Sequence, residues 1–339
     1  MSLKTCVFYS YITGYVLPSE VICTLPKGNK HTLKGVEGMK NQTFGVEIEM
    51  TGITRETAAM IAVKFLGGTI ERSFDSYDTY KVIAPDNRIW EVMSDASIVT
   101  MKNEKGSLSL GGRDYSVEFV TPILKYNDIE TLQEIIRRLR HAGAVSESRL
   151  KCGIHIHIGA KDHTPNTLKN LVNLIASKED LIYKSLEIDP ARVRYCKKVN
   201  ENLIEMINKK KPKSLSELAD IWYSDYGEES RNKHYHSSRY HGLNLHSTFT
   251  KGTIEFRLFN GTLHAGKIRS YIVLCLAISY QALKQKSASA RRTHTDNEKY
   301  TFRCWLLRLG LIGDEFKNCR KHLMKALDGD AAWKTPRIA

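Results

Sequence analysis

Three segments that lie far apart in the sequence carry carboxylates, imidazoles or a guanidinium at every second position. They span residues 43–50, 153–159 and 253–259, and their other positions are mainly apolar. Side chains two residues apart on a β-strand point to the same face. Each segment therefore predicts a strand with one apolar face and one face of groups that bind metal ions or phosphates. Those groups are Glu47, Glu49, His155, His157, Glu255 and Arg257.

The chemistry that such a face favours is the handling of a nucleotide's phosphates. Glu47 and Glu49 would lie about 6.6 Å apart along their strand, where two carboxylates repel by roughly 2–3 kcal/mol at an effective dielectric constant near 20. Glu255 and Glu118 are expected on the same face, which increases the repulsion unless cations bind. Carboxylates with one or two imidazoles favour Mg²⁺ or Mn²⁺ over zinc. Arg257 adds a forked donor suited to a phosphate.

Each motif taken alone has a more ordinary explanation. A Glu-x-Glu pair on a strand is usually a solvated face, and a Glu-x-Arg pair is most often a surface ion pair. The His-x-His pair is more informative, because histidine is uncommon in such an alternation. The functional interpretation depends on all three segments having an equally apolar opposite face, which in the third segment comprises Ile254, Phe256 and Leu258.

The remaining segments predict the elements that position these strands. Further strands are expected at 77–83, 89–93 and 115–120. Helices are expected at 55–66, 165–188, 199–207, 215–223 and 264–284, with two more after a linker at 287–299. Another helix begins with Asn127 and Glu130 in capping-box spacing and ends at Gly143. Strands and helices do not alternate regularly, which favours an α+β fold with a curved, largely antiparallel sheet, the active site on one face and helices on the other.

Composition narrows the class of protein further. The chain has 339 residues and a net charge of +14. No stretch approaches the roughly 20 apolar residues of a membrane span, and we expect no signal peptide. Seven cysteines are scattered through the sequence without a CxxC pair, which indicates a reducing compartment and a cytoplasmic protein.

Six segments, in this order, resemble the amidoligase family, whose relatives include glutamine synthetase and glutamate–cysteine ligase. They are FGVEIE at 44–49, WEVMSDAS at 90–97, EFVTPI at 118–123, CGIHIHIG at 152–159, RYHGLNL at 239–245 and TIEFRLFNGT at 253–262. The resemblance covers roughly residues 41–330. It implies a sheet of the glutamine synthetase-like catalytic type and an ATP-dependent carboxylate–amine ligase that works through an acyl phosphate with divalent metal ions. The expected partners are a carboxylate-bearing substrate and an amine or ammonia acceptor, with a homo-oligomer left open.

The resemblance also implies a role for each residue of the motifs. One metal ion, on the nucleotide phosphates, would be held by Glu47, His155 and Glu255. A second, near the substrate carboxylate, would be held by Glu49 and Glu118. His157 would face the nucleotide, with Asn244 as a weaker nucleotide ligand. Arg257 would stabilise the transferring phosphoryl group, and Arg239 would bind the acyl phosphate or the substrate carboxylate. Asp95 would contact the incoming amine, or it would have only the structural role of forming a turn.

The same resemblance suggests how the chain is organised. We expect an N-terminal extension at 1–40, a catalytic domain at 41–285 and a basic helical segment at 286–339. The polar, glycine-containing segments 102–114 and 224–243 are candidates for lids that exclude water from the acyl phosphate.

Two other functions compete with the ligase. A metal-dependent hydrolase of the amidohydrolase type also uses a His-x-His strand, completed by Glu118 or Asp95. This chain lacks the repeating strand–helix period of that class, and the hydrolase interpretation leaves Arg257 without a role. A basic nucleic-acid-binding protein is the weaker alternative. Residues 281–339 hold 13 Lys or Arg against 6 Asp or Glu, but no nucleic-acid-binding motif accompanies them.

Overall fold

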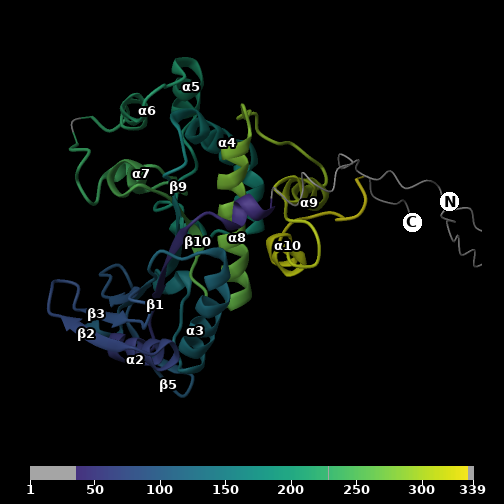
Figure 1. The fold of residues 1–339 in the computed structure, drawn as a ribbon. Helices are drawn as coiled ribbons and strands as arrows, with labels where there is room; N and C mark the ends of the chain where they lie inside the picture. Colours follow the sequence, from purple (N-terminus) through teal and green to yellow (C-terminus); the bar gives the residue numbers. More distant parts are fainter. Residues whose placement is uncertain (1–35, 228, 335–339) are drawn as a thin grey trace, which may run out of the picture.

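A sheet of eight antiparallel strands forms the centre of the described chain (Figure 1). The computed structural model describes residues 36–227 and 229–334, so most of the predicted N-terminal extension lies outside it. The strand order is β2-β3-β4-β7-β1-β8-β10-β9, and the sheet does not close on itself. The bounds are β1 Phe44–Met50, β2 Thr69–Ser73, β3 Thr79–Ile83, β4 Ile89–Met93, β7 Val117–Val120, β8 Gly153–Gly159, β9 Leu243–Asn244 and β10 Thr253–Asn260. The expected α+β class with an antiparallel sheet is confirmed.

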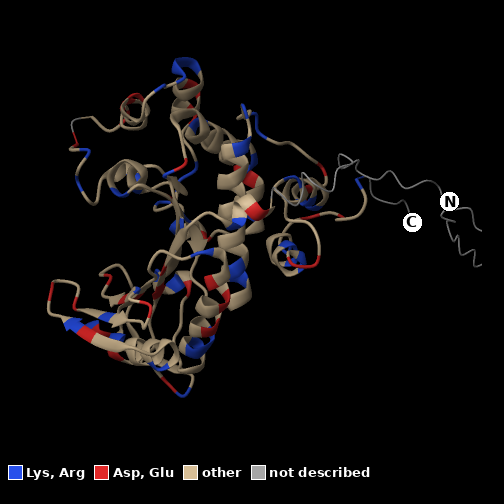
Figure 2. Ribbon diagram, in the orientation of Figure 1, with Lys and Arg blue, Asp and Glu red and all other residues tan. Residues whose placement is uncertain are grey.

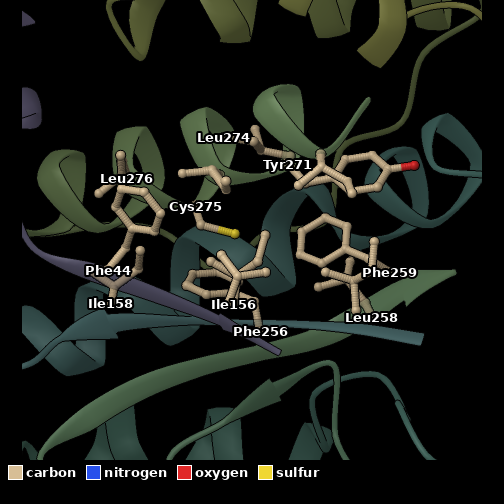
Figure 3. Close-up of a cluster of buried hydrophobic side chains, with 14 of the residues drawn as sticks. Phe44, Ile156, Ile158, Phe256, Leu258, Phe259, Tyr271, Leu274, Cys275 and Leu276 are labelled. Atoms are coloured by element: carbon tan, nitrogen blue, oxygen red, sulfur yellow. The ribbon is translucent and has the colours of Figure 1, made fainter. Parts of the chain in front are cut away.

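The three segments with alternating chemistry are neighbours in this sheet, as β1, β8 and β10. Their apolar side chains, among them Phe44, Ile156 and Phe256, are buried. Helix α8, Ala265–Lys284, lies over this face (Figure 3). Burying this much apolar surface against a long helix fixes the orientation of the strands, so their polar positions must point to the opposite face.

A β-bulge in β10 changes the alternation that the sequence predicts. Phe256 lies opposite Ile156, but the next paired residue on β10 is Phe259, which lies opposite Ile154. Phe259 therefore takes the position expected for Leu258, and its ring stacks on Tyr271 of α8 with 4.5 Å between the ring centroids. The extra residue of a bulge turns the side chains beside it, and Arg257 lies within this irregular stretch.

Most of the predicted helices are confirmed at their predicted positions. They are α2 Arg55–Leu66, α4 Pro165–Ser185, α5 Glu201–Lys210, α6 Leu215–Trp222 and α8. Thr54 caps α2 and Thr164 caps α4 through their side-chain oxygens. The expected capping box of α3, Ile129–His141, is wrong. A 3₁₀ turn precedes this helix, and the carboxylate of Asp128 accepts from the backbone N–H of Lys125 instead, at 2.8 Å.

One expected loop contains a hairpin, and the expected linker packs along a helix without regular structure of its own. Residues 102–114 were expected to be a loop, but β5, Met101–Glu104, and β6, Ser107–Leu110, form a hairpin there. The predicted linker after α8 is bound along α4: the N–H of Thr293 donates to the carbonyl of Ser177 at 3.0 Å, and Asn173 donates to the carbonyl of Ala288 at 2.9 Å. The chain then forms α9, Glu298–Arg308, and α10, Lys317–Leu323, beside α8 (Figure 1). Among the described helices, none combines the length and apolar character of a membrane span.

Candidate functional site

The register of the sheet brings the predicted site residues face to face. Glu47 on β1 pairs with His155 on β8, and Glu49 pairs with Glu118 on β7. On the other side of β8, His157 pairs with Glu255 of β10. Directly paired residues on antiparallel strands point to the same face, so these side chains share the front of the sheet.

The first group of possible metal ligands consists of Glu47, His155 and Glu255, whose ligand atoms lie within 4.8 Å of one another. The Oε2 of Glu47 is 2.9 Å from the Nδ1 of His155. The Oε1 of Glu255 is 3.9 Å from the same nitrogen. His157 borders the group, with its Nε2 at 3.2 Å from the Oε1 of Glu47. These are short-range contacts between groups that a divalent ion can bridge.

The second group consists of Glu49, Glu118 and His155, also with ligand atoms within 4.8 Å of one another. The Nε2 of His155 lies 3.9 Å from the Oε1 of Glu49. His155 therefore presents one ring nitrogen to each group. The other oxygen of Glu49 accepts from the backbone N–H of Gly153 at 2.6 Å, which fixes the orientation of this carboxylate.

Charge in these two groups is incompletely balanced. Burial raises the pKa of Glu118 well above its usual value, and the charges of Glu47 and Glu49 raise it further. Burial would also raise the pKa of Glu47, but His157 and His155 outweigh it and hold that pKa well below normal. A carboxyl group whose ionisation is opposed by burial and by neighbouring carboxylates is typical of a site where cations supply the missing charge. The donor set therefore fits Mg²⁺ or Mn²⁺.

Arg257 is buried beside the first group. Its Nη1 is 2.5 Å from the Oε1 of Glu255, and the pKa of Glu255 falls to about 2, because Arg257 and His157 outweigh the effect of burial. The Nε of Arg257 is buried and has no hydrogen-bond partner among the described residues. A buried donor without a partner is costly, and an oxygen of a bound phosphate would satisfy it.

A cavity of about 170 Å³ opens against Glu255. Arg239, Asn244 and Lys251 are among the residues that line it. The amide of Asn244 donates to the Oε2 of Glu255 at 2.6 Å, and its own oxygen accepts from the N–H of His246 at 2.8 Å. Asn244 thus positions Glu255, whereas Arg239 and Lys251 supply positive charge to the cavity. Lys251 was missed, since a lysine before a glycine carries no signal in the sequence.

Asp95, the remaining predicted residue, belongs to neither group of ligands. Its Oδ1 accepts from the N–H of Ser97 at 2.6 Å. This is the contact of an Asx turn, so the structure gives the carboxylate a local role at the end of β4.

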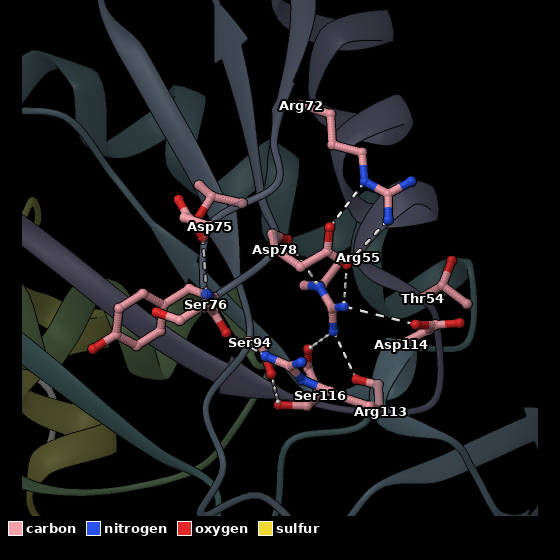
Figure 4. Close-up of polar contacts among 12 residues, drawn as sticks. Thr54, Arg55, Arg72, Asp75, Ser76, Asp78, Ser94, Arg113, Asp114 and Ser116 are labelled. Atoms are coloured by element: carbon pink, nitrogen blue, oxygen red, sulfur yellow. Dashed lines mark hydrogen bonds and ion pairs between the residues drawn. The ribbon is translucent and has the colours of Figure 1, made fainter.

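Arg55, at the start of α2, organises the neighbouring turns and was also missed (Figure 4). Its guanidinium is buried, pairs with Asp78 at 2.6 Å and donates to the carbonyls of Arg113 and Ser116 at 2.6 and 2.9 Å. These bonds fix the turn between β2 and β3 against the segment that leads into β7. In the sequence Arg55 looks like an ordinary exposed residue of a helix's first turn.

Comparison with known proteins adds a family. Residues 40–279 match the family model described as "Putative amidoligase enzyme". No curated protein matches the sequence. Among solved structures, a bifunctional glutathione synthetase from Pasteurella multocida is similar with a TM-score of 0.41 and 11% identity, over 87% of this chain and 49% of that one. The chain thus spans about half the length of that protein, and a likeness of this strength carries no argument by itself.

Proposed function

The chain belongs to the amidoligase family, and on that premise we propose that it is an ATP-dependent carboxylate–amine ligase that forms an amide through an acyl phosphate. Family membership supports an amide-bond-forming ligase. The observation that carries the finer proposal is the pair of acid–histidine groups that share His155 and border Arg257. We further propose that the sheet is of the glutamine synthetase-like catalytic type, with residues 41–285 as the catalytic domain.

Two divalent ions, Mg²⁺ or Mn²⁺, fit this site. Glu47, His155 and Glu255 would hold the ion on the nucleotide phosphates. Glu49 and Glu118 would hold the ion near the substrate carboxylate, with the second nitrogen of His155 in reach. Bound there, the ions would neutralise the charge that repels a carboxylate from a polyphosphate.

The chain's own cations complete the proposed chemistry. Arg257 stabilises the phosphoryl group as it moves to the substrate carboxylate, and its unpartnered Nε supplies a free donor for this purpose. Arg239 and Lys251 attract the acyl phosphate or the substrate carboxylate into the cavity beside Glu255. His157, whose pKa is raised because Glu47 and Glu255 outweigh the effect of burial, is then a neighbour of the nucleotide phosphates.

The proposal also needs water to be excluded from the acyl phosphate. Residues 224–243 supply His234 and Arg239 to the cavity at Glu255. Tyr235 in the same segment contacts Tyr77 in the turn between β2 and β3, with 2.9 Å between their hydroxyl oxygens. The segment is therefore tied to the part of the chain at the other edge of the sheet, beside β2 and β3, and suits the role of a lid. The hairpin at 101–110 does not line this cavity and is a weaker lid candidate.

The hydrolase alternative makes no use of Arg257, which lies in contact with a proposed metal ligand. The location proposed for the enzyme remains the cytoplasm, since Cys152, Cys196, Cys275 and Cys319 are free thiols.

An ADP-release screen tests the proposal directly. The full chain would be supplied with Mg²⁺-ATP and combinations of carboxylic acids with ammonia, amino acids, polyamines or peptides, and products would be identified by mass spectrometry. The ligase predicts ADP release that requires both an acid and an amine, with one amide formed per ADP. Hydrolysis of amides without any nucleotide would instead support the hydrolase.

A further inference from the structure

A second cavity, of about 530 Å³, lies among the helices on the side of the sheet opposite the glutamates. It is lined by residues of α3, α8 and α10 and of the segment before α10. None of these residues belongs to either acid–histidine group. They are Gln133, Arg137, Arg140, His264, Ala265, Gly266, Arg269, Glu315, Asn318, Cys319 and His322.

The lining carries more positive charge than its neighbours balance. Arg140 and Arg269 have no carboxylate within 4.0 Å among the described residues. Arg137 pairs with Glu134 at 3.2 Å, but Arg138 shares that glutamate. Lys and Arg recur along α3, α8 and α10 (Figure 2). Three arginines thus line the cavity with little acidic compensation.

The acidic residue of the lining, Glu315, is already occupied. Lys40 pairs with it at 2.7 Å, and its Oε1 accepts from the hydroxyl of Tyr126 at 2.8 Å. Arg269 reaches the same hydroxyl at 3.4 Å rather than the carboxylate. The guanidinium of Arg269 thus lowers the pKa of Glu315 without forming an ion pair with it, so no carboxylate among the described residues holds it in place.

The first turn of α8 forms one wall of the cavity. His264 is the N-cap residue, and its side chain accepts from the N–H of Lys267 at 3.2 Å. A Cβ on Gly266 would lie 3.1 Å from ring atoms of both His264 and His322, so glycine leaves room for the two rings at this turn. Burial lowers the pKa of His322, and the charges of His264 and Lys267 lower it further, which is a sign of uncompensated positive charge.

We propose that this cavity binds a small phosphorylated molecule, whose phosphate contacts Arg140, Arg269 and the start of α8. The volume falls in the range of small-molecule pockets, about 300–1,000 Å³. Planar guanidinium groups match the geometry of a phosphate, and the start of a long helix favours a dianion. The strand that carries Glu255 and Arg257 leads into this helix through residues 261–264, so the ligand would sit one short connection from the catalytic face.

Titration calorimetry with inorganic pyrophosphate tests the proposal. Measurements would use the full chain in about 0.15 M KCl, where exposed charges are screened, and EDTA, which removes metal ions. Wild type is compared with R140A, with R140A/R269A and with the control R291A/R308A, which removes two exposed arginines that do not line the cavity. E49Q serves as a fourth variant, because it changes the proposed catalytic site alone.

The expected result is equal affinity for wild type, E49Q and R291A/R308A, a weaker affinity for R140A, and at least a tenfold increase in Kd for R140A/R269A. Unchanged binding in R140A/R269A would overturn the proposal. Binding lost in E49Q but kept in R140A/R269A would locate pyrophosphate at the catalytic face and would also overturn it. Citrate bound as tightly as pyrophosphate would refute the assignment to phosphates. None of these outcomes depends on ligase activity.

Discussion

The hydroxyl groups of Tyr77 and Tyr235 lie 2.9 Å apart, although 158 residues separate them in the sequence. Tyr77 lies in the turn between β2 and β3, and Tyr235 lies in the segment that lines the cavity at Glu255. The bond joins two parts of the chain that β4, β7, β1, β8 and β10 otherwise separate. Both rings are partly exposed, so the bond can break and reform without unfolding the core.

Loss of this bond should uncouple the proposed reaction. In Y77F the turn and the segment lose one hydrogen bond, which lowers stability by only about 1 kcal/mol. Water should then reach the acyl phosphate more often, and the ratio of ADP released to amide formed should rise above one. Parallel assays of ADP and amide measure this ratio. The control is Y195F, a half-exposed tyrosine outside the cavity, and the same ratio in all three proteins would refute a lid role.

Replacement of Arg55 should weaken the fold far more than replacement of Arg72. Arg55 is 2% exposed and satisfies Asp78 and two backbone carbonyls. R55A leaves the buried Ser116 carbonyl without this donor, and it also removes the donor to the part-buried Arg113 carbonyl and Asp78 carboxylate. We expect a loss of about 3–5 kcal/mol in the free energy of unfolding. Arg72 pairs with the same aspartate but its side chain is 43% exposed, so R72A should cost at most about 1 kcal/mol. Urea unfolding of the two variants measures the difference. Equal losses would contradict the role of Arg55 in holding the neighbouring turns together.

Glu179, in α4, predicts a pH dependence of stability. Burial raises its pKa from 4.5 to about 7, although the N–H of Val199 donates to it. The folded chain therefore holds this proton more tightly than the unfolded chain, and stability is lost as the pH rises from about 4.5 through 7. E179Q should be more stable than wild type at pH 8, by up to about 3 kcal/mol, with the gain shrinking toward pH 5. The same gain at both pH values in urea unfolding would exclude titration of Glu179 as the cause.

His155 should matter to both metal ions, because it presents a different nitrogen to each group. We expect H155A to weaken both Mn²⁺ sites by about 10-fold or more, as counted by electron paramagnetic resonance of free Mn²⁺. H294A, which changes an exposed histidine outside the site, should bind as wild type does. Two undisturbed sites in H155A would show that the shared imidazole is not a ligand.

The sequence predicted the structure best in the strands whose alternating pattern also carries the candidate site residues. Alternation on β1 and β8 predicted both the strands and their polar faces, because period two has one structural meaning. It could not predict which residues pair, so the contact between Glu47 and His155 had to come from the register of the sheet. The bulge at Arg257 could not be predicted either, because an inserted residue leaves the apolar composition of β10 unchanged.

Other misses have different causes. The hairpin β5–β6 has short strands, MKNE and SLSL, whose few apolar residues (Met101, Leu108 and Leu110) make too weak a pattern to mark it in the sequence. Arg55 acquires its role from turns that fold against it from far along the chain, and Lys251 acquires its role from the way residues 232–255 fold around the cavity. Such tertiary roles leave no trace in local spacing.

The central claim is that the acid–histidine groups and Arg257 act together on a metal-bound nucleotide, and E49Q tests it most directly. Glutamine keeps an acceptor oxygen for the N–H of Gly153, so the fold should survive while the metal-binding charge is lost. Glu71→Gln, which changes an exposed carboxylate on β2, is the matched control. In the ADP-release assay with Mg²⁺-ATP, we predict at least about a 100-fold loss for E49Q and R257A and full activity for E71Q. Turnover at the wild-type rate in E49Q or R257A, each with an unchanged unfolding transition, would contradict the account.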